Sequence, residues 1–137
     1  CGMLFMCFAF VFGPMDALQA EVRALFLGLQ LGRQRGISRL VVESACLVLI
    51  SCLQRSWGVP DVIRPIVRAI QGIAPVGHRL SHCYSEGNSV ADSLASYANA
   101  RGFFETFTMV AQLPGRTRGL LALDMQSFCS FRFSFRR

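Results

Sequence analysis

Three side chains in this sequence could do chemistry, namely the carboxylates of Glu21 and Asp92 and the imidazole of His82. His82 and Asp92 lie ten residues apart, and the polar loop between them leads into a helical segment. Glu21 lies on an earlier helical segment. Carboxylates bind hard divalent cations and an imidazole transfers protons near neutral pH, so these groups could support metal-dependent or acid–base chemistry. Each also has a structural explanation, since the helix dipole stabilises an acid in a first turn.

Position 45 is where a functional side chain would be expected, and it holds an alanine. Arg39–Glu43 predicts a short buried strand, and Cys46–Arg55 predicts a helix that follows almost at once. In open α/β sheets, sites form beyond the carboxyl ends of the strands. Ala45 lies at such an end, and its methyl group offers no donor atom.

The helix that must position Glu21 is predicted over residues 16–35. Asp16 is a suitable N-cap, Gln19 completes a capping-box pattern, and Gly36 ends the helix. Apolar residues recur along it at helical spacing, namely Leu18, Val22, Leu25 and Leu29. Glu21 falls on the border of this stripe, so we expect its carboxylate to be partly desolvated and able to point into a cleft.

The remaining elements alternate between strand and helix. Strands are expected over residues 3–12 and 79–84, and helices over residues 61–71 with Asp61 as cap, from Asn88 or Ser89 to about residue 100, and over residues 120–124. The last ten residues alternate Phe, Ser and Arg, a pattern typical of an edge strand or of a frayed terminus. The order β-α-β-α-α-β-α predicts an α/β layer in which helices back a sheet.

Composition limits the class of protein. The 137 residues are enough for one domain with a real core, and the 53% apolar content excludes an intrinsically disordered chain. The net charge is +6, and all fourteen basic residues are arginine. Arginine matches phosphate oxygens in bidentate geometry, which favours an anionic partner such as nucleic acid; a solvated basic surface is the alternative.

The cysteines and the first apolar run exclude other classes. None of the six cysteines forms a C-x-x-C motif or a zinc-type spacing, so we interpret them as reduced thiols of an intracellular protein. The apolar run over residues 3–12 is ten residues long, whereas a membrane-spanning helix needs about 20. A basic leader and cleavage site typical of a signal peptide are not visible.

The segments Ala17–Glu21, Leu40–Ser44 and His82–Asp92 together resemble the ribonuclease H family, specifically the plant ribonuclease H-like domains related to retrotransposon reverse transcriptases. The matching patterns are A-L-Q-A-E, L-V-V-E-S and H-x-Y-x-E-G-N-x-V-A-D. The resemblance covers about residues 9–125 and implies a ribonuclease H-like α/β fold, with a mixed central sheet flanked by helices. It also implies an N-terminally truncated domain over residues 1–102, followed by a partly irregular C-terminal extension over residues 103–137.

The resemblance further implies an activity. Members of the family cut the RNA strand of RNA–DNA hybrids with two divalent ions, Mg²⁺ or Mn²⁺, held by four carboxylates. Glu21 and Asp92 match two of these metal-binding carboxylates, and His82 matches a histidine that assists proton transfer. Glu21, His82 and Asp92 are therefore the expected catalytic residues, and Asn88 matches a loop-ordering asparagine. Ala45 stands where the family has an aspartate, and the first-strand aspartate has no counterpart, so we expect hydrolysis to be weak or absent.

Three hypotheses follow. The first is a ribonuclease H-type domain that binds RNA–DNA hybrids and cleaves them poorly. The second is an inactive nucleic-acid-binding or structural relic of the same fold. The third is a thiol or metal protein built on the cysteines, against which their spacing argues. We expect nucleic acid as the partner, with no membrane and no small-molecule cofactor, and the oligomeric state stays open.

Overall fold

The computed structural model describes residues 7–9, 15–37, 40–55, 58–73, 79–102, 104–124 and 131–133. Its helices are α1 (Ala17–Gln34), α2 (Leu47–Arg55), α3 (Arg64–Ile73), α4 (Ser89–Arg101) and α5 (Gly115–Asp124). Its strands are β1 (Cys7–Ala9), β2 (Val41–Ser44), β3 (Arg79–His82), β4 (Glu105–Phe107) and β5 (Phe131–Phe133). Short 3-10 turns, η1 (Ser85–Asn88) and η2 (Val110–Gln112), precede α4 and α5. The predicted α/β class is confirmed.

The sheet that matters for the site is parallel and has the order β3-β2-β5. Ser44, the last residue of β2, lies in register with His82 on one side and with Phe133 on the other. The helices α2 and α3 make the crossover from β2 to β3, as parallel strands require. Among the described strands, β1 and β4 form a separate antiparallel pair, so the single mixed sheet implied by the resemblance divides in two here.

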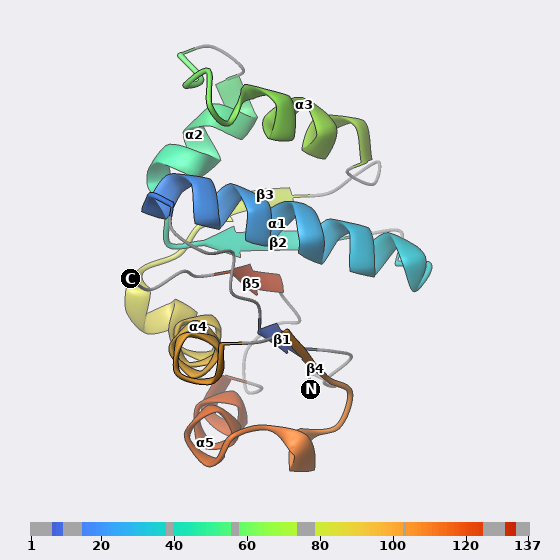
Figure 1. Ribbon diagram of the computed structural model, residues 1–137, viewed down its shortest axis with the longest axis vertical. Helices are drawn as coiled ribbons and strands as arrows, with labels where there is room; N and C mark the ends of the chain where they lie inside the picture. The colour runs from blue at the N-terminus through green and yellow to red at the C-terminus, as the bar shows by residue number, and fades with distance from the viewer. Residues whose placement is uncertain are drawn as a thin grey trace.

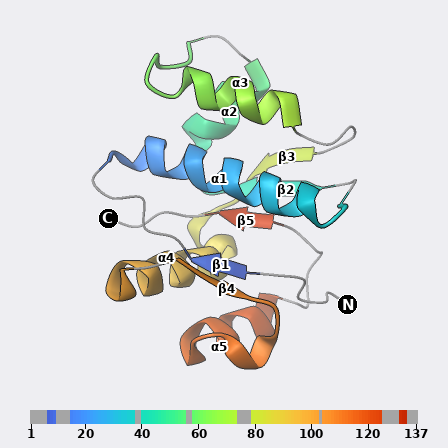
Figure 2. The ribbon, with the colours of Figure 1, turned by 45° about the vertical axis from the view of Figure 1, so that its right-hand side comes forward.

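Two apolar cores lie on either side of this arrangement (Figures 1 and 2). The helices α1, α2 and α3 pack together at one end of the long axis, over the β2 and β3 side of the parallel sheet. Their shared core contains Leu25 from α1, Val42 from β2 and Leu49 from α2, all fully buried. The helices α4 and α5 pack against β4 in a smaller core around Phe107. Within the described ranges, no helix has the length and apolar character needed to cross a membrane.

The helix α1 forms as its sequence predicts. The Asp16 carboxylate accepts a hydrogen bond of 2.7 Å from the Gln19 backbone N–H, which satisfies one of the free donors of the first turn. Gly36 follows the helix with φ of 74°, a left-handed conformation that glycine adopts without steric cost. The predicted stripe faces the core, where Val22, Leu25 and Leu29 are buried and Leu18 packs at the edge.

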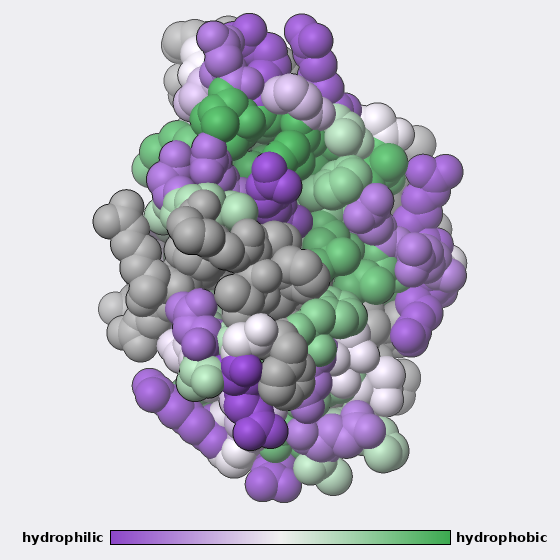
Figure 3. Space-filling view, viewed as in Figure 1, coloured by the Kyte–Doolittle hydropathy of each residue, from purple (hydrophilic) through white to green (hydrophobic). Residues whose placement is uncertain are grey.

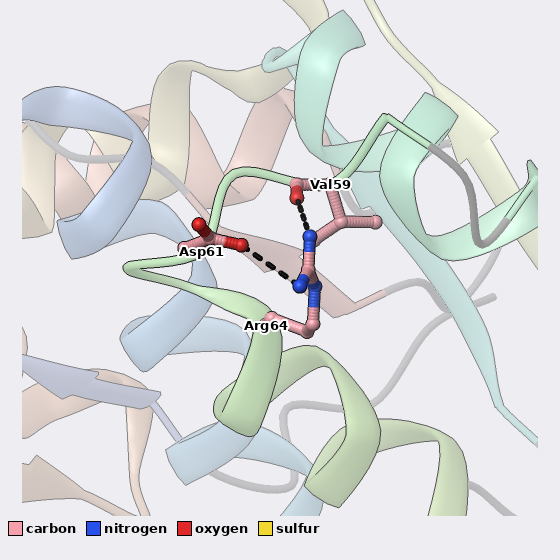
Figure 4. Close-up of polar contacts among 3 residues, drawn as sticks. All are labelled: Val59, Asp61 and Arg64. Atoms are coloured by element: carbon pink, nitrogen blue, oxygen red, sulfur yellow. Dashed lines mark hydrogen bonds and ion pairs between the residues drawn. The ribbon is translucent and has the colours of Figure 1, made fainter.

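The start of α3 differs from the prediction by three residues. Asp61 was expected to cap this helix, but its carboxylate forms an ion pair of 2.8 Å with Arg64 instead (Figure 4). The same guanidinium donates a hydrogen bond of 3.1 Å to the Val59 carbonyl, which ties the loop to the helix start. Pro65 lies in the first turn, where its missing N–H leaves no helix hydrogen bond unmade.

The C-terminal elements also depart from the prediction. The helix α5 begins at Gly115, five residues before the expected start at Leu120. Its docking is specific, since the hydroxyls of Thr117 and Ser93 hydrogen-bond at 2.7 Å inside the α4–α5 contact. Phe131–Phe133 is a strand, one of the two alternatives for the tail, and it pairs in parallel with β2.

Truncating the core side of α2 should destabilise the protein, whereas truncating its outer side should not. Leu49 is fully buried and Leu47 is 60% exposed on the same helix. We expect Leu49→Ala to lower the free energy of unfolding by about 2–5 kcal/mol, because it removes buried methyl groups and leaves a cavity. Leu47→Ala is the matched control and should change it by less than about 1 kcal/mol. Urea unfolding followed by circular dichroism measures both, and equal losses would contradict the placement of the core.

Candidate functional site

The carboxyl ends of β2 and β3 bring the first candidate residues together. His82 ends β3 directly beside Ser44, which ends β2. The Cys83 backbone N–H then donates a hydrogen bond of 3.0 Å to the Ser44 carbonyl, extending the contact one residue past the strands. Ala45 follows Ser44 in the chain and is half-buried. Position 45 therefore lies close to His82, one residue past the paired strand ends.

Glu21 reaches the same end of the sheet from α1. Its side chain is only 6% exposed, so it is more deeply buried than the stripe border predicted. Burial raises the pKa of the Cys46 thiol, and the negative charge of Glu21 raises that pKa further. The charge of Glu21 therefore acts on the thiol of the segment that follows β2.

Cys46 is a site residue that the sequence analysis missed. The backbone N–H groups of Val48 and Leu49 hydrogen-bond to its sulfur and oppose the rise of the thiol pKa. Cys46 directly precedes α2, and its carbonyl accepts a hydrogen bond of 3.2 Å from the Ile50 N–H. Its own N–H donates a hydrogen bond of 3.0 Å to Ser44 Oγ. This hydrogen bond spans Ala45 and fixes the turn between β2 and α2. In the sequence, only the position of Cys46 just before a helical pattern could have pointed to it.

Asp92 lies in the first turn of α4, which begins shortly after β3 by way of η1. Its side chain is half-buried. The next residue, Ser93, points into the α4–α5 contact, and one helical step of about 100° turns Asp92 away from that contact. Asn88 occupies the N-cap position and is 1% exposed, but its side chain makes no capping hydrogen bond to the helix.

His82 is exposed, and its ring meets the ring of Tyr84 edge-on, with centroids 5.6 Å apart. The structure thus places position 45 close to His82 at one end of the sheet, and the helix of Asp92 begins shortly after β3. Of Glu21 it shows burial and a charge that acts on the Cys46 thiol. In the part of the chain that the structure describes, no group of three or more His, Cys, Asp or Glu side chains lies close enough to hold a metal ion. The carboxylates expected from the resemblance therefore do not gather into a complete cluster there.

The basic residues lie on the outside. Each arginine whose side chain the structure describes is exposed: Arg23, Arg33, Arg35, Arg64, Arg68, Arg79, Arg101, Arg116 and Arg118. On the face seen in Figure 3, hydrophilic side chains gather at the top, right and bottom around an apolar band. Exposed guanidinium groups on a chain of net charge +6 give a surface that attracts phosphate.

The proximity of Glu21 to Cys46 has a measurable effect. Glu21→Gln removes a negative charge that raises the thiol pKa, so a larger fraction of Cys46 will be thiolate at pH 8. We expect Cys46 to react with iodoacetamide faster than in the unaltered protein, as read by mass spectrometry of its peptide. Glu43→Gln is the matched control, because Glu43 is not among the charges that act on this thiol. An unchanged Cys46 rate in Glu21→Gln would mean that Glu21 points elsewhere.

The comparisons with known proteins agree with this geometry. A family model described as reverse transcriptase-like matches residues 2–98, more than half of the chain. No curated protein and no solved structure gives a significant match. The matched range includes Glu21, Ala45, His82 and Asp92. The chain therefore belongs to the reverse transcriptase-like family of ribonuclease H-like domains.

Proposed function

We propose that this chain is a ribonuclease H-type domain that binds RNA–DNA hybrids and whose ancestral cleavage of the RNA strand is impaired. The observation that carries the proposal is Ala45, which follows the carboxyl end of β2, where Ser44 pairs with His82 at the end of β3. The charge of Glu21 acts on the adjacent Cys46 thiol. The surrounding fold and family membership support a nucleic-acid partner. The residue at the centre of the site cannot contribute a ligand.

The donor set does not fit the two divalent ions that the family uses. Mg²⁺ requires hard oxygen ligands in near-octahedral geometry, and two such ions need several carboxylates that converge. Glu21 and Asp92 are the two carboxylates that match the family pattern, and Ala45 supplies no oxygen. Binding of the hybrid does not depend on this set, because the exposed arginines can contact its phosphates.

The alternative is a relic of the fold with no catalytic function, either as a nucleic-acid-binding or as a structural domain. Hybrid binding distinguishes the proposal from a structural relic. The proposal predicts affinity for hybrid that falls with salt, and a structural relic predicts none. Cleavage distinguishes an inactive binding domain, because it would give no products under any metal condition.

Hybrid binding should weaken steeply with salt. Each phosphate contact releases condensed counterions, so a surface that makes about three or more contacts loses affinity by at least about tenfold between 50 and 200 mM KCl. Fluorescence anisotropy with a labelled 12-base-pair RNA–DNA hybrid measures the dissociation constant at each salt concentration. A free fluorophore and an uncharged nucleic-acid analogue serve as controls. Absence of binding at 50 mM KCl, or binding indifferent to salt, would overturn the proposed function.

Restoring an acid at position 45 should create affinity for a divalent ion. Ala45→Asp adds a carboxylate next to Cys46, whose thiol is within reach of the Glu21 charge, and we expect it to bind Mn²⁺ at least about tenfold more tightly than the unaltered protein. Paramagnetic resonance of free Mn²⁺ measures the affinity, and circular dichroism checks that the variant folds. Ala45→Asn is the matched control of equal size without the charge, and Glu21→Gln added to Ala45→Asp should remove most of the gain.

The same proteins, incubated with hybrid and Mn²⁺ or Mg²⁺, test the impairment itself. The unaltered protein should give slow, metal-dependent cleavage, whereas the absence of products with both ions would favour the inactive binding domain. Efficient cleavage by the unaltered protein would show that Ala45 does not disable the site. Equal Mn²⁺ affinity in Ala45→Asp and in its Glu21→Gln double variant would instead show that Glu21 takes no part.

A further inference from the structure

The aromatic ring of Tyr84 is unusually accessible for a residue at the edge of a site. Tyr84 follows β3 by two residues and is 79% exposed, more than any other large apolar or aromatic side chain that the structure describes. An exposed aromatic ring gains little from burial in the folded chain, so its contribution to folding is small. A ring in this position is available to a ligand at the carboxyl end of the sheet.

The exposed ring is nevertheless held in place. His82 lies edge-on to it, with centroids 5.6 Å apart and planes at 78°. The Tyr84 carbonyl accepts a hydrogen bond of 2.9 Å from Gly87, and the preceding residue, Cys83, is tied to Ser44. Because the backbone is fixed on both sides of Tyr84, a ligand that stacks on the ring loses little entropy in ordering it.

The other tyrosine of the chain shows the contrast. The Tyr97 hydroxyl donates a hydrogen bond of 2.7 Å to Glu105 Oε2. Its ring meets Phe107 edge-on at 6.0 Å, and the Arg101 guanidinium lies 5.6 Å from the ring centroid. The hydroxyl and the ring of Tyr97 therefore both make contacts that join α4 to β4. Tyr84 has no comparable role in joining these elements.

We propose that Tyr84, braced by His82, is a stacking platform for an unpaired nucleobase bound at the carboxyl ends of β2 and β3. The inference rests on the proposed function, because it assumes that the chain binds nucleic acid. It specifies the ligand as a hybrid with a single-stranded extension, since bases inside a duplex have both faces covered by their neighbours. Stacking on an aromatic side chain contributes about 1–3 kcal/mol per base and tolerates any base, so the platform selects strand state and not sequence.

The charge of the protein suits this ligand. The chain carries +6, and its described arginines are all exposed, which attracts the phosphates of the duplex part. The acidic Glu21 at the same end of the sheet is buried, so it does not present its carboxylate at the surface on which the base would lie. The two contributions are separable, because charge holds the backbone and Tyr84 holds one base.

Fluorescence anisotropy with three probes separates the contribution of phosphate attraction from that of base stacking. The probes are a blunt 12-base-pair hybrid, the same hybrid with a three-nucleotide DNA extension on either end, and the extended hybrid with abasic extension nucleotides. For the unaltered protein we expect the extended hybrid to bind tightest and the abasic one to resemble the blunt one. Tyr84→Ala should weaken binding of the extended hybrid about five- to a hundred-fold and leave the blunt hybrid within about twofold.

Three further variants make the result specific. Tyr84→Phe keeps the ring and should bind all probes as the unaltered protein does. Tyr84→Leu keeps an apolar side chain without a π face and should lose most of the preference for the extension. Phe104→Ala removes another exposed aromatic ring, 45% exposed and just before β4, and is the matched control that should change nothing.

The outcomes are distinct. If Tyr84→Ala binds every probe as tightly as the unaltered protein does, the platform is wrong and the proposed function stands. An equal loss on all three probes would show that Tyr84 orders the loop and does not stack on a base, which also overturns the platform. If the unaltered protein binds none of the probes, the proposed function fails as well.

Discussion

The parallel pairing of β2 with β3 is the constraint on which the candidate site depends. It places His82 beside Ser44, and the Cys83–Ser44 hydrogen bond carries the register past the ends of the strands. A shift of one residue would turn Val42 and Ser44 out of the core and bring Glu43 into it, so burial of that face fixes the register. This register therefore sets the position of Ala45 and Cys46, which follow Ser44 in the chain.

The chain separates its charges in space. Glu21 is buried, where a low-polarity environment makes a negative charge costly to hold. The described arginines lie outside, where water solvates them and a polyanion can reach them. A basic exterior and a buried acid therefore occupy different parts of the described structure.

Local patterns predicted most of the fold, and tertiary contacts decided the rest. The helix α1 was predictable because the Asp16 cap and the apolar stripe both lie within the segment. The start of α3 was not, because Asp61 engages Arg64 in place of the helix backbone. The helix α5 begins earlier than its apolar residues suggested, because Thr117 gains a buried partner in Ser93, 24 residues away.

The candidate site residues also fall into two groups, those that the sequence pointed to and those that depend on tertiary packing. Spacing and family pattern pointed to Glu21, His82, Asp92 and the alanine at position 45. The deep burial of Glu21 depends on how α1 packs, which no local pattern states. Cys46 went unnoticed because cysteine is not a preferred helix cap, and Tyr84 because exposure of an aromatic ring depends on the whole surface.

The strand β5 has a consequence for the order in which the chain can fold. It pairs Phe131 with Val42, two residues separated by about ninety positions, whereas β3 follows β2 much sooner. During synthesis β2, β3 and their crossover helices can assemble while the edge of β2 that β5 will cover is still open. Contacts so distant along the sequence close slowly because of their loop entropy. The nascent protein therefore passes through a stage with an unpaired edge on β2, when a chaperone or a second strand can reach it.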